Sequence, residues 1–150
     1  MARPSRHVTT CPSLEEFLST ARREFGFLAS EFGFTELPDT RVHPNPFCVR
    51  YKSQNATVTI DGIQWGFGVQ VLLSASAGQP TVPLWAVAES RGLKYELRSG
   101  QLAQLARDAA LLRSAATDIL RGDLSSFPAA MRVVDHHAAE ATKPKRRILP

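Results

Sequence analysis

The sequence predicts one α+β domain: an N-terminal helix, then a three-stranded antiparallel meander, then C-terminal helices packed on one sheet face. Two observations support this class. Apolar residues recur at helical spacing near the start and again after residue 100, and three consecutive stretches between them alternate apolar with polar residues. The meander gains a fourth strand if residues 93–99 are extended. With 150 residues, the chain fits one domain over 12–142, between a flexible 1–11 segment and a basic 143–150 tail.

The first helix is predicted over about 14–31. Ser13 and Glu16 have the spacing of a capping box, and Gly33 is placed to end the helix. Gly26 interrupts the pattern at a cost of about 1 kcal/mol relative to alanine, so a break at that position is the alternative. Its apolar stripe contains Leu14, Phe17, Leu18, Ala21, Phe25, Leu28 and Phe32.

The strands follow a loop, predicted over 35–46 from its three prolines. Residues 47–52 alternate, 53–55 turn the chain, and 56–60 alternate again. Asp61-Gly62 is the two-residue signal of a hairpin, which predicts a turn there. The third strand then runs to Leu73. Its expected apolar face holds Ile63, Trp65, Phe67, Val69, Val71 and Leu73.

Three helical segments are predicted after the sheet. Residues 74–82 form a loop, Pro83 opens a short helix with Leu84, Trp85 and Ala88 inward, and Gly92 closes it. A longer helix over 101–121 ends at Gly122. Ser125 or Ser126 caps the last helix, which tolerates Pro128 in its first turn. We expect the first helix and the 101–121 helix to cover the apolar sheet face around Trp65, Phe67 and Val69.

The net charge of +4 belongs to the tail, because Lys143, Lys145, Arg146 and Arg147 carry it. Without these four, fourteen basic residues face fourteen acidic ones. A nucleic-acid-binding domain more often spreads its basic residues over a face. The tail can still contact nucleic acid, and the excess of arginine and alanine suggests a GC-rich bacterial source.

No stretch predicts a membrane span or a secretion signal, so we expect a cytoplasmic protein that does not enter a membrane. Cys11 and Cys48 are interpreted as reduced thiols, with a disulfide between them as the alternative.

Few residue clusters have the spacing of a chemical site. His136, His137 and Glu140 share a helical face, but a metal site needs further ligands, so we expect no metal. No turn typical of a nucleophile surrounds Cys48. Gly66 and Gly68 alternate within a predicted strand instead of opening a helix, which excludes a phosphate loop. We therefore expect no catalytic residue and no cofactor.

The polar face of the predicted sheet is the candidate binding surface. It is flat because Gly66 and Gly68 lie on it, and glycine inside a strand allows a partner to come close. An ordinary solvated sheet face is the other interpretation. The predicted contact residues are Arg50, Lys52, Thr57, Thr59, Gln64 and Gln70.

Three stretches carry a resemblance: 27–34 (FLASEFGF), 47–61 (FCVRYKSQNATVTID) and 119–127 (ILRGDLSSF). They resemble a loosely defined group of small uncharacterised bacterial proteins, some of them predicted immunity proteins of polymorphic toxin systems. The chain departs from that group at Lys52, where an acidic residue is common, and in its basic tail. The resemblance implies no catalytic residue.

These observations give three functional hypotheses. The first is a non-catalytic protein-binding module, in one version immunity-like, whose partner is another protein. The second is an accessory protein tethered to nucleic acid or a larger assembly by Lys143–Arg147. The third is a small enzyme with an unrecognised site. The oligomeric state is left open.

Overall fold

Helices cover one face and one edge of a five-stranded antiparallel sheet in the parts of the chain that the computed structural model describes, residues 12–38, 45–63, 68–75, 80–97 and 100–142. The elements in chain order are α1 (Leu14–Glu24), α2 (Phe27–Phe32), β1 (Thr35–Glu36), β2 (Cys48–Lys52), β3 (Ala56–Ile63), β4 (Gly68–Ala75), β5 (Thr81–Pro83), α3 (Leu84–Ser90), α4 (Gln101–Ala115), α5 (Thr117–Leu120) and α6 (Phe127–Thr142). The predicted α+β class is confirmed. The predicted 1–11 segment and 143–150 tail lie outside the described residues.

The first helix forms with the predicted cap but breaks where glycine interrupts it. The Ser13 hydroxyl accepts a hydrogen bond from the Glu16 backbone N–H at 3.1 Å. The helix ends at Glu24, and α2 begins after Gly26, at which a Cβ would lie 3.0 Å from the Arg22 carbonyl oxygen. Gly33 ends α2 in the left-handed conformation, with φ of 72°. The chain therefore follows the predicted alternative of two helices.

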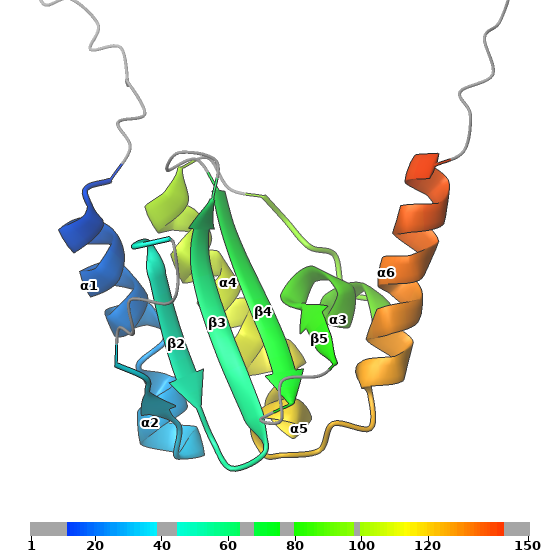
Figure 1. Cartoon of the computed structure of the whole chain (residues 1–150), viewed down its shortest axis with the longest axis horizontal. Helices are drawn as coiled ribbons and strands as arrows, with labels where there is room; N and C mark the ends of the chain where they lie inside the picture. The colour runs from blue at the N-terminus through cyan, green and yellow to red at the C-terminus, as the bar shows by residue number, and fades with distance from the viewer. Residues whose placement is uncertain (1–11, 39–44, 64–67, 76–79, 98–99, 143–150) are drawn as a thin grey trace, which may run out of the picture.

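The sheet is a meander with the strand order β1-β2-β3-β4-β5, all antiparallel (Figure 1). The predicted count of three or four strands is too low, because β1 and β5 lie in stretches that were predicted as loops. Strands of two and three residues are too short to show an alternating pattern. The fourth strand expected within 93–99 does not form over the described residues 93–97.

The predicted turn at Asp61-Gly62 is wrong. Both residues lie inside β3, where Asp61 pairs with Gln70 and Gly62 pairs with Val69. The Gly62 N–H donates to the Phe47 carbonyl at 2.8 Å and its carbonyl accepts from Asn45 Nδ2 at 2.8 Å, so the backbone of this residue is bonded toward the start of β2. The connection from β3 to β4 falls in residues 64–67, which lie outside the described residues. The predicted positions of Gln64, Trp65, Gly66 and Phe67 therefore lie outside them as well. The turn predicted over 53–55 is confirmed.

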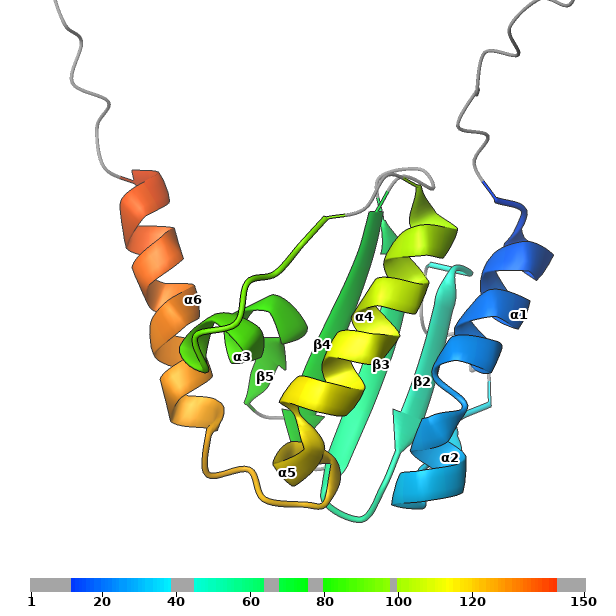
Figure 2. The same cartoon turned by 180° about the vertical axis from the view of Figure 1, so that it is seen from behind.

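One face of the sheet is covered by helices, as predicted. Figure 2 shows α4 crossing this face, with α1 alongside it over β2. The predicted 101–121 helix is two helices, because the chain leaves helical geometry at Ala116. The core between the two layers contains Phe17, Phe25, Leu28, Val49, Val58, Ile60, Val69, Val71, Leu73, Leu105, Leu112 and Ile119.

The last helix packs at the edge of the sheet instead of on its face, which corrects the expectation for the C-terminal helices. In Figure 1, α6 stands beside α3 and β5, and its contacts are with these two elements. Pro128 lies in its first turn, as predicted. Every residue from Asp135 to Thr142 is exposed, although His137 contacts Trp85 and Glu89 of α3. No described helix is both long enough and apolar enough to cross a membrane.

Candidate functional site: the open face of the sheet

The sheet face opposite α4, here called the open face, is the candidate site. It faces the viewer in Figure 1, where no labelled helix lies in front of it. Its side chains are the strand positions that alternate with the core residues: Cys48, Arg50, Lys52, Thr57, Thr59, Asp61, Ile63, Gln70, Leu72, Ser74, Thr81 and Pro83.

The strand register arranges these side chains, apart from Ile63, in three rows across the sheet. The middle row is Arg50, Thr59, Leu72 and Pro83. The lower row contains Lys52, Thr57, Ser74 and Thr81, and the upper row contains Cys48, Asp61 and Gln70. Neighbouring rows are two residues apart along a strand, which is about 7 Å.

Five of the six predicted contact residues lie on this one face. Arg50 and Lys52 come from β2, Thr57 and Thr59 from β3, and Gln70 from β4. Gln64 is outside the described residues. The corrected register moves Ile63 to the open face, where its side chain is 36% exposed.

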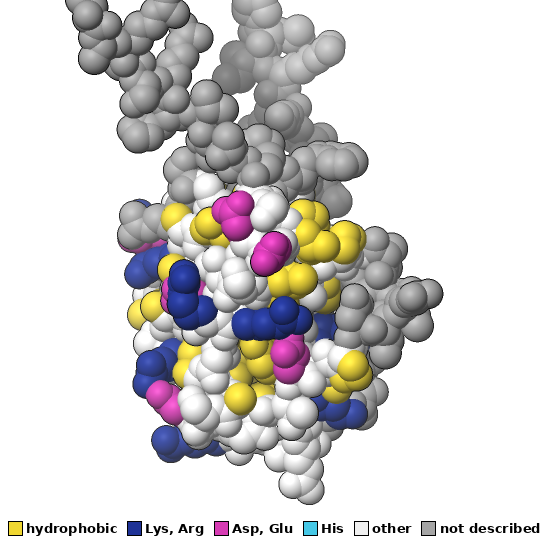
Figure 3. Space-filling model, turned by 90° about the vertical axis from the view of Figure 1, so that its left-hand side faces the viewer, with side chains coloured by type: hydrophobic (Ala, Val, Ile, Leu, Met, Phe, Trp, Pro, Cys, Tyr) yellow, Lys and Arg dark blue, Asp and Glu magenta, His cyan; other side chains and the backbone are white. Residues whose placement is uncertain are grey.

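The polar side chains of the open face are largely unused by the fold. Within the described chain, no hydrogen bond is found for the side chains of Lys52, Thr57, Thr59, Gln70 and Ser74. Elsewhere several charged groups are paired, as for Arg22 with Glu36, Arg107 with Glu96, Arg113 with Glu31 and His137 with Glu89. The flank shown in Figure 3 accordingly carries basic and acidic side chains next to one another.

A further ion pair, between Arg91 and Asp118, fixes the end of α3 against α5. Arg91 donates from both terminal nitrogens to the Asp118 carboxylate, each at 2.7 Å, and also to the Ala115 carbonyl. These hydrogen bonds lower the pKa of Asp118 and raise that of Arg91. Arg91 thus bonds to residues on both sides of Ala116, where the predicted long helix breaks into α4 and α5.

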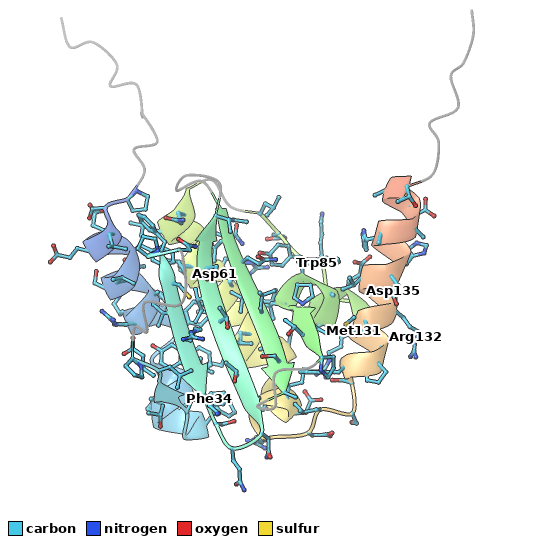
Figure 4. The ribbon with its side chains drawn as sticks, in the orientation of Figure 1. Phe34, Asp61, Trp85, Met131, Arg132 and Asp135 are labelled. Atoms are coloured by element: carbon cyan, nitrogen blue, oxygen red, sulfur yellow. The ribbon has the colours of Figure 1, made fainter. Side chains whose placement is uncertain are left out.

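Asp61 is the open-face residue that sequence reasoning missed. Its residue is only 9% exposed, and its Oδ1 atom is buried with no hydrogen-bond donor. Neither Arg50 nor Lys52 forms an ion pair with it. Figure 4 shows it on β3, seen from the open side. Asp61 is two residues after Thr59 and four after Thr57, so alternation predicts it on the same face. The turn predicted at Asp61-Gly62 hid this signal.

A second polar group missed by the sequence lies inside the helical layer. Asp108 is completely buried, and it accepts hydrogen bonds from Gln104 Nε2 at 2.8 Å and from the Tyr95 hydroxyl at 3.1 Å. Burial raises the pKa of Asp108 to about 6, although these two hydrogen bonds act to lower it. Burial also raises the pKa of Tyr95. Gln104 Nε2 also donates to the Glu96 carbonyl at 3.3 Å, so these hydrogen bonds hold residues 95–96 against α4.

A hollow of about 350 Å³ lies where α2, the β2–β3 turn and the end of α5 meet. Each of the three stretches behind the family resemblance contributes to it: Glu31, Phe32, Gly33, Ser53, Gln54, Asn55, Leu120, Arg121 and Gly122. The Asn55 side chain lies so close to Gly122 that a Cβ there would be 2.4 Å from Asn55 Nδ2. The three motifs therefore meet in one packing contact.

The remaining predicted clusters have ordinary packing roles or fall outside the described chain. The His137 ring contacts Trp85 edge to face, with centroids 5.0 Å apart, and its Nε2 lies 2.7 Å from Glu89 Oε2. Figure 4 shows Trp85 on α3 and Met131 and Arg132 on α6. The described residues contain no group of three or more metal-binding side chains. Cys11 and the basic residues Lys143, Lys145, Arg146 and Arg147 are not described.

The comparisons with known proteins add no relative to this geometry. No family model matches the chain, and neither a curated protein nor a solved structure does.

Proposed function

We propose that this chain is a non-catalytic protein-binding module, immunity-like in that it occludes its partner, and that it binds through the open face. The observation that supports this is the set of polar side chains on the open face that the fold itself does not use. In a folded chain most buried polar groups are bonded, and surface groups left over are available for another molecule.

The composition of the face also suits a protein partner. Leu72 and Pro83 lie together in the middle row, and polar side chains lie in the rows on both sides. This apolar pair lies toward the β5 edge with Thr59 at the centre of the face, and protein–protein interfaces combine apolar patches with polar surroundings.

The size of the face sets a limit on the contact. Five strands about 4.8 Å apart, each with about five residues of 3.4 Å, cover roughly 400 Å². A stable interface buries about 800 Å² on each partner. A tightly bound partner would therefore extend past the sheet, and the exposed half of α6 is a neighbouring surface it could use.

A pair of matched arginine substitutions tests the proposal. Thr59→Arg places a bulky charge in the middle of the open face, whereas Ala103→Arg places the same charge on exposed α4, behind the sheet. A partner is first recovered from source cells with the tagged chain, identified by mass spectrometry and purified, and its affinity is then measured by calorimetry. We expect Thr59→Arg to weaken binding at least tenfold and Ala103→Arg to leave it unchanged.

The affinities of the two variants show whether the partner binds the open face. Equal affinity for both variants, with both folded by circular dichroism, would remove the open face as the binding surface. The immunity-like version has its own requirement: the partner's toxic activity falls to background when the complex forms.

A further inference from the structure

We infer that the partner places a cationic side chain, arginine or lysine, against Asp61; this inference depends on the proposed function of the open face. Asp61 lies at the centre of the upper row, between Cys48 on β2 and Gln70 on β4. Among the open-face residues that the structure describes it is the acidic one, and its Oδ1 atom is buried without a donor.

Among the described residues, no hydrogen bond or ion pair to the Asp61 side chain is found. A buried carboxylate is costly unless hydrogen bonds or an opposite charge offset the loss of water. The two cross-strand neighbours of Asp61 are a thiol and an amide, and no hydrogen bond from Gln70 reaches it within the described chain. Arg50 and Lys52 form no ion pair with it.

A guanidinium or ammonium group from outside would supply what is missing. Charge-assisted hydrogen bonds to a carboxylate are about twice as strong as neutral ones, and they gain strength where water is displaced. Asp61 occupies a strand position on the open face, which is the face that the partner would cover. A phosphate group would be repelled there, so the residue favours a protein over a nucleic acid.

The charges on the face also define an orientation. Arg50 and Lys52 both lie on β2, whereas Asp61 lies on β3. The Lys52 row is four residues from the Asp61 row, roughly 14 Å along the strands. A complementary partner would thus set its cation over β3 at the upper row and an acidic group over β2 at the lower rows.

The test uses small probes of defined charge and the whole chain labelled with nitrogen-15. Capped tripeptides with a central arginine, lysine or citrulline between glycines are titrated to roughly 20 mM, the range in which single contacts bind. We expect the arginine and lysine peptides to shift the amide signals of residues 60–62 and 69–71. Citrulline has the shape of arginine without its charge, and should leave them in place.

Two substitutions identify the carboxylate responsible. Asp61→Asn should reduce the arginine-induced shifts to the citrulline level, with a melting temperature no lower than that of the parent chain. Asp135→Asn, at an exposed site on α6, should leave the shifts unchanged. Equal shifts in the parent and Asp61→Asn proteins, or none in the parent, would overturn the inference.

Two further experiments test the other possible occupants of the site, which are the basic tail and a second copy of the chain. If a chain cut before Lys143 binds the arginine peptide several times more tightly, the basic tail is the occupant. If the mass in solution doubles with concentration and Asp61→Asn prevents this, the occupant is a second copy. Either result overturns the inference.

Failure of the inference is distinguishable from failure of the proposed function. A purified partner lost by Thr59→Arg but kept by Asp61→Asn refutes the cationic contact alone. A partner kept by both variants refutes binding through the open face.

Discussion

Asp108 shows how the interior of the protein sets the behaviour of a single residue. The carboxyl is fully buried on α4, yet it is bonded to Gln104 and Tyr95. Burial favours its neutral form, which accounts for a pKa of about 6 instead of 3.8. The folded state therefore holds this proton at a pH where the unfolded chain has released it.

This difference makes stability depend on pH. Because the folded pKa is the higher one, the contribution of Asp108 to stability is complete below pH 4 and is lost as the pH rises through 6. A rise of the pKa from 3.8 to about 6 corresponds to roughly 3 kcal/mol of unfolding free energy. We expect Asp108→Asn to lack this loss, so that its stability relative to the parent increases by about that amount between pH 4 and 7. Urea unfolding at a series of pH values measures it.

Tyr95→Phe provides the companion variant. The Tyr95 hydroxyl donates to Asp108 and lowers its pKa, so removing the hydroxyl should shift the loss of stability to a higher pH. Parallel pH profiles for the parent and Asp108→Asn proteins would show that the carboxyl does not titrate in this range.

At the scale of elements, Gly62 decides how the helical layer approaches the sheet. A Cβ at this position would lie 2.6 Å from Gln101 Nε2, 2.9 Å from Phe47 Cβ and 3.3 Å from Phe17 Cε2. The glycine lets α1 and α4 come close to β3. The Gln101 amide in turn donates to the Gly68 carbonyl at 2.9 Å, which ties α4 to the start of β4.

Gly62→Ala should overpack this contact. Gln101 has a flexible end that can move, but Phe47 Cβ is held close to the backbone, so we expect a loss of about 1–3 kcal/mol of unfolding free energy. Chemical unfolding of Gly62→Ala, Gln101→Ala and the double variant measures the coupling between the sites. We expect the double variant to be more stable than the sum of the single effects predicts, by about 0.5–3 kcal/mol. Strict additivity would mean that the two residues do not compete for the same space.

The elements also show what sequence could predict. The alternation of apolar and polar residues predicted which side chains of β2, β3 and β4 face the helices. It could do so because residues on one face are buried and those on the other are not. The caps at Ser13, Gly33 and Gly122 follow from local geometry and were found. The signal at Asp61-Gly62 misled because the glycine serves a distant contact with Phe17 and Gln101.

The misplaced turn at Asp61-Gly62 also limited the prediction of the site. Alternation alone placed five of the predicted contact residues together on the open face. Asp61 was lost with the misplaced turn. The buried polar network was missed because Gln101, Gln104 and Asp108 occur at steps of three and four beside the apolar stripe, where polar residues usually face water.

At the scale of the whole molecule, charge is separated between the body and the tail. The four basic residues Lys143, Lys145, Arg146 and Arg147 carry the net charge of +4, and the remaining residues balance. They follow the exposed end of α6. Binding through the open face and binding through the tail should therefore respond differently to truncation and to salt.

We predict that any affinity of the chain for duplex DNA comes from these four residues. Four phosphate contacts would release counterions so that log K falls with log salt with a slope of about −3.6. Fluorescence anisotropy with labelled DNA should give a slope no steeper than this for the whole chain, and no binding for a chain cut before Lys143. Affinity for a protein partner should survive the same cut, because Thr59 and the rest of the open face remain. DNA binding that persists after truncation would contradict a neutral body and place a nucleic-acid surface on the folded domain itself.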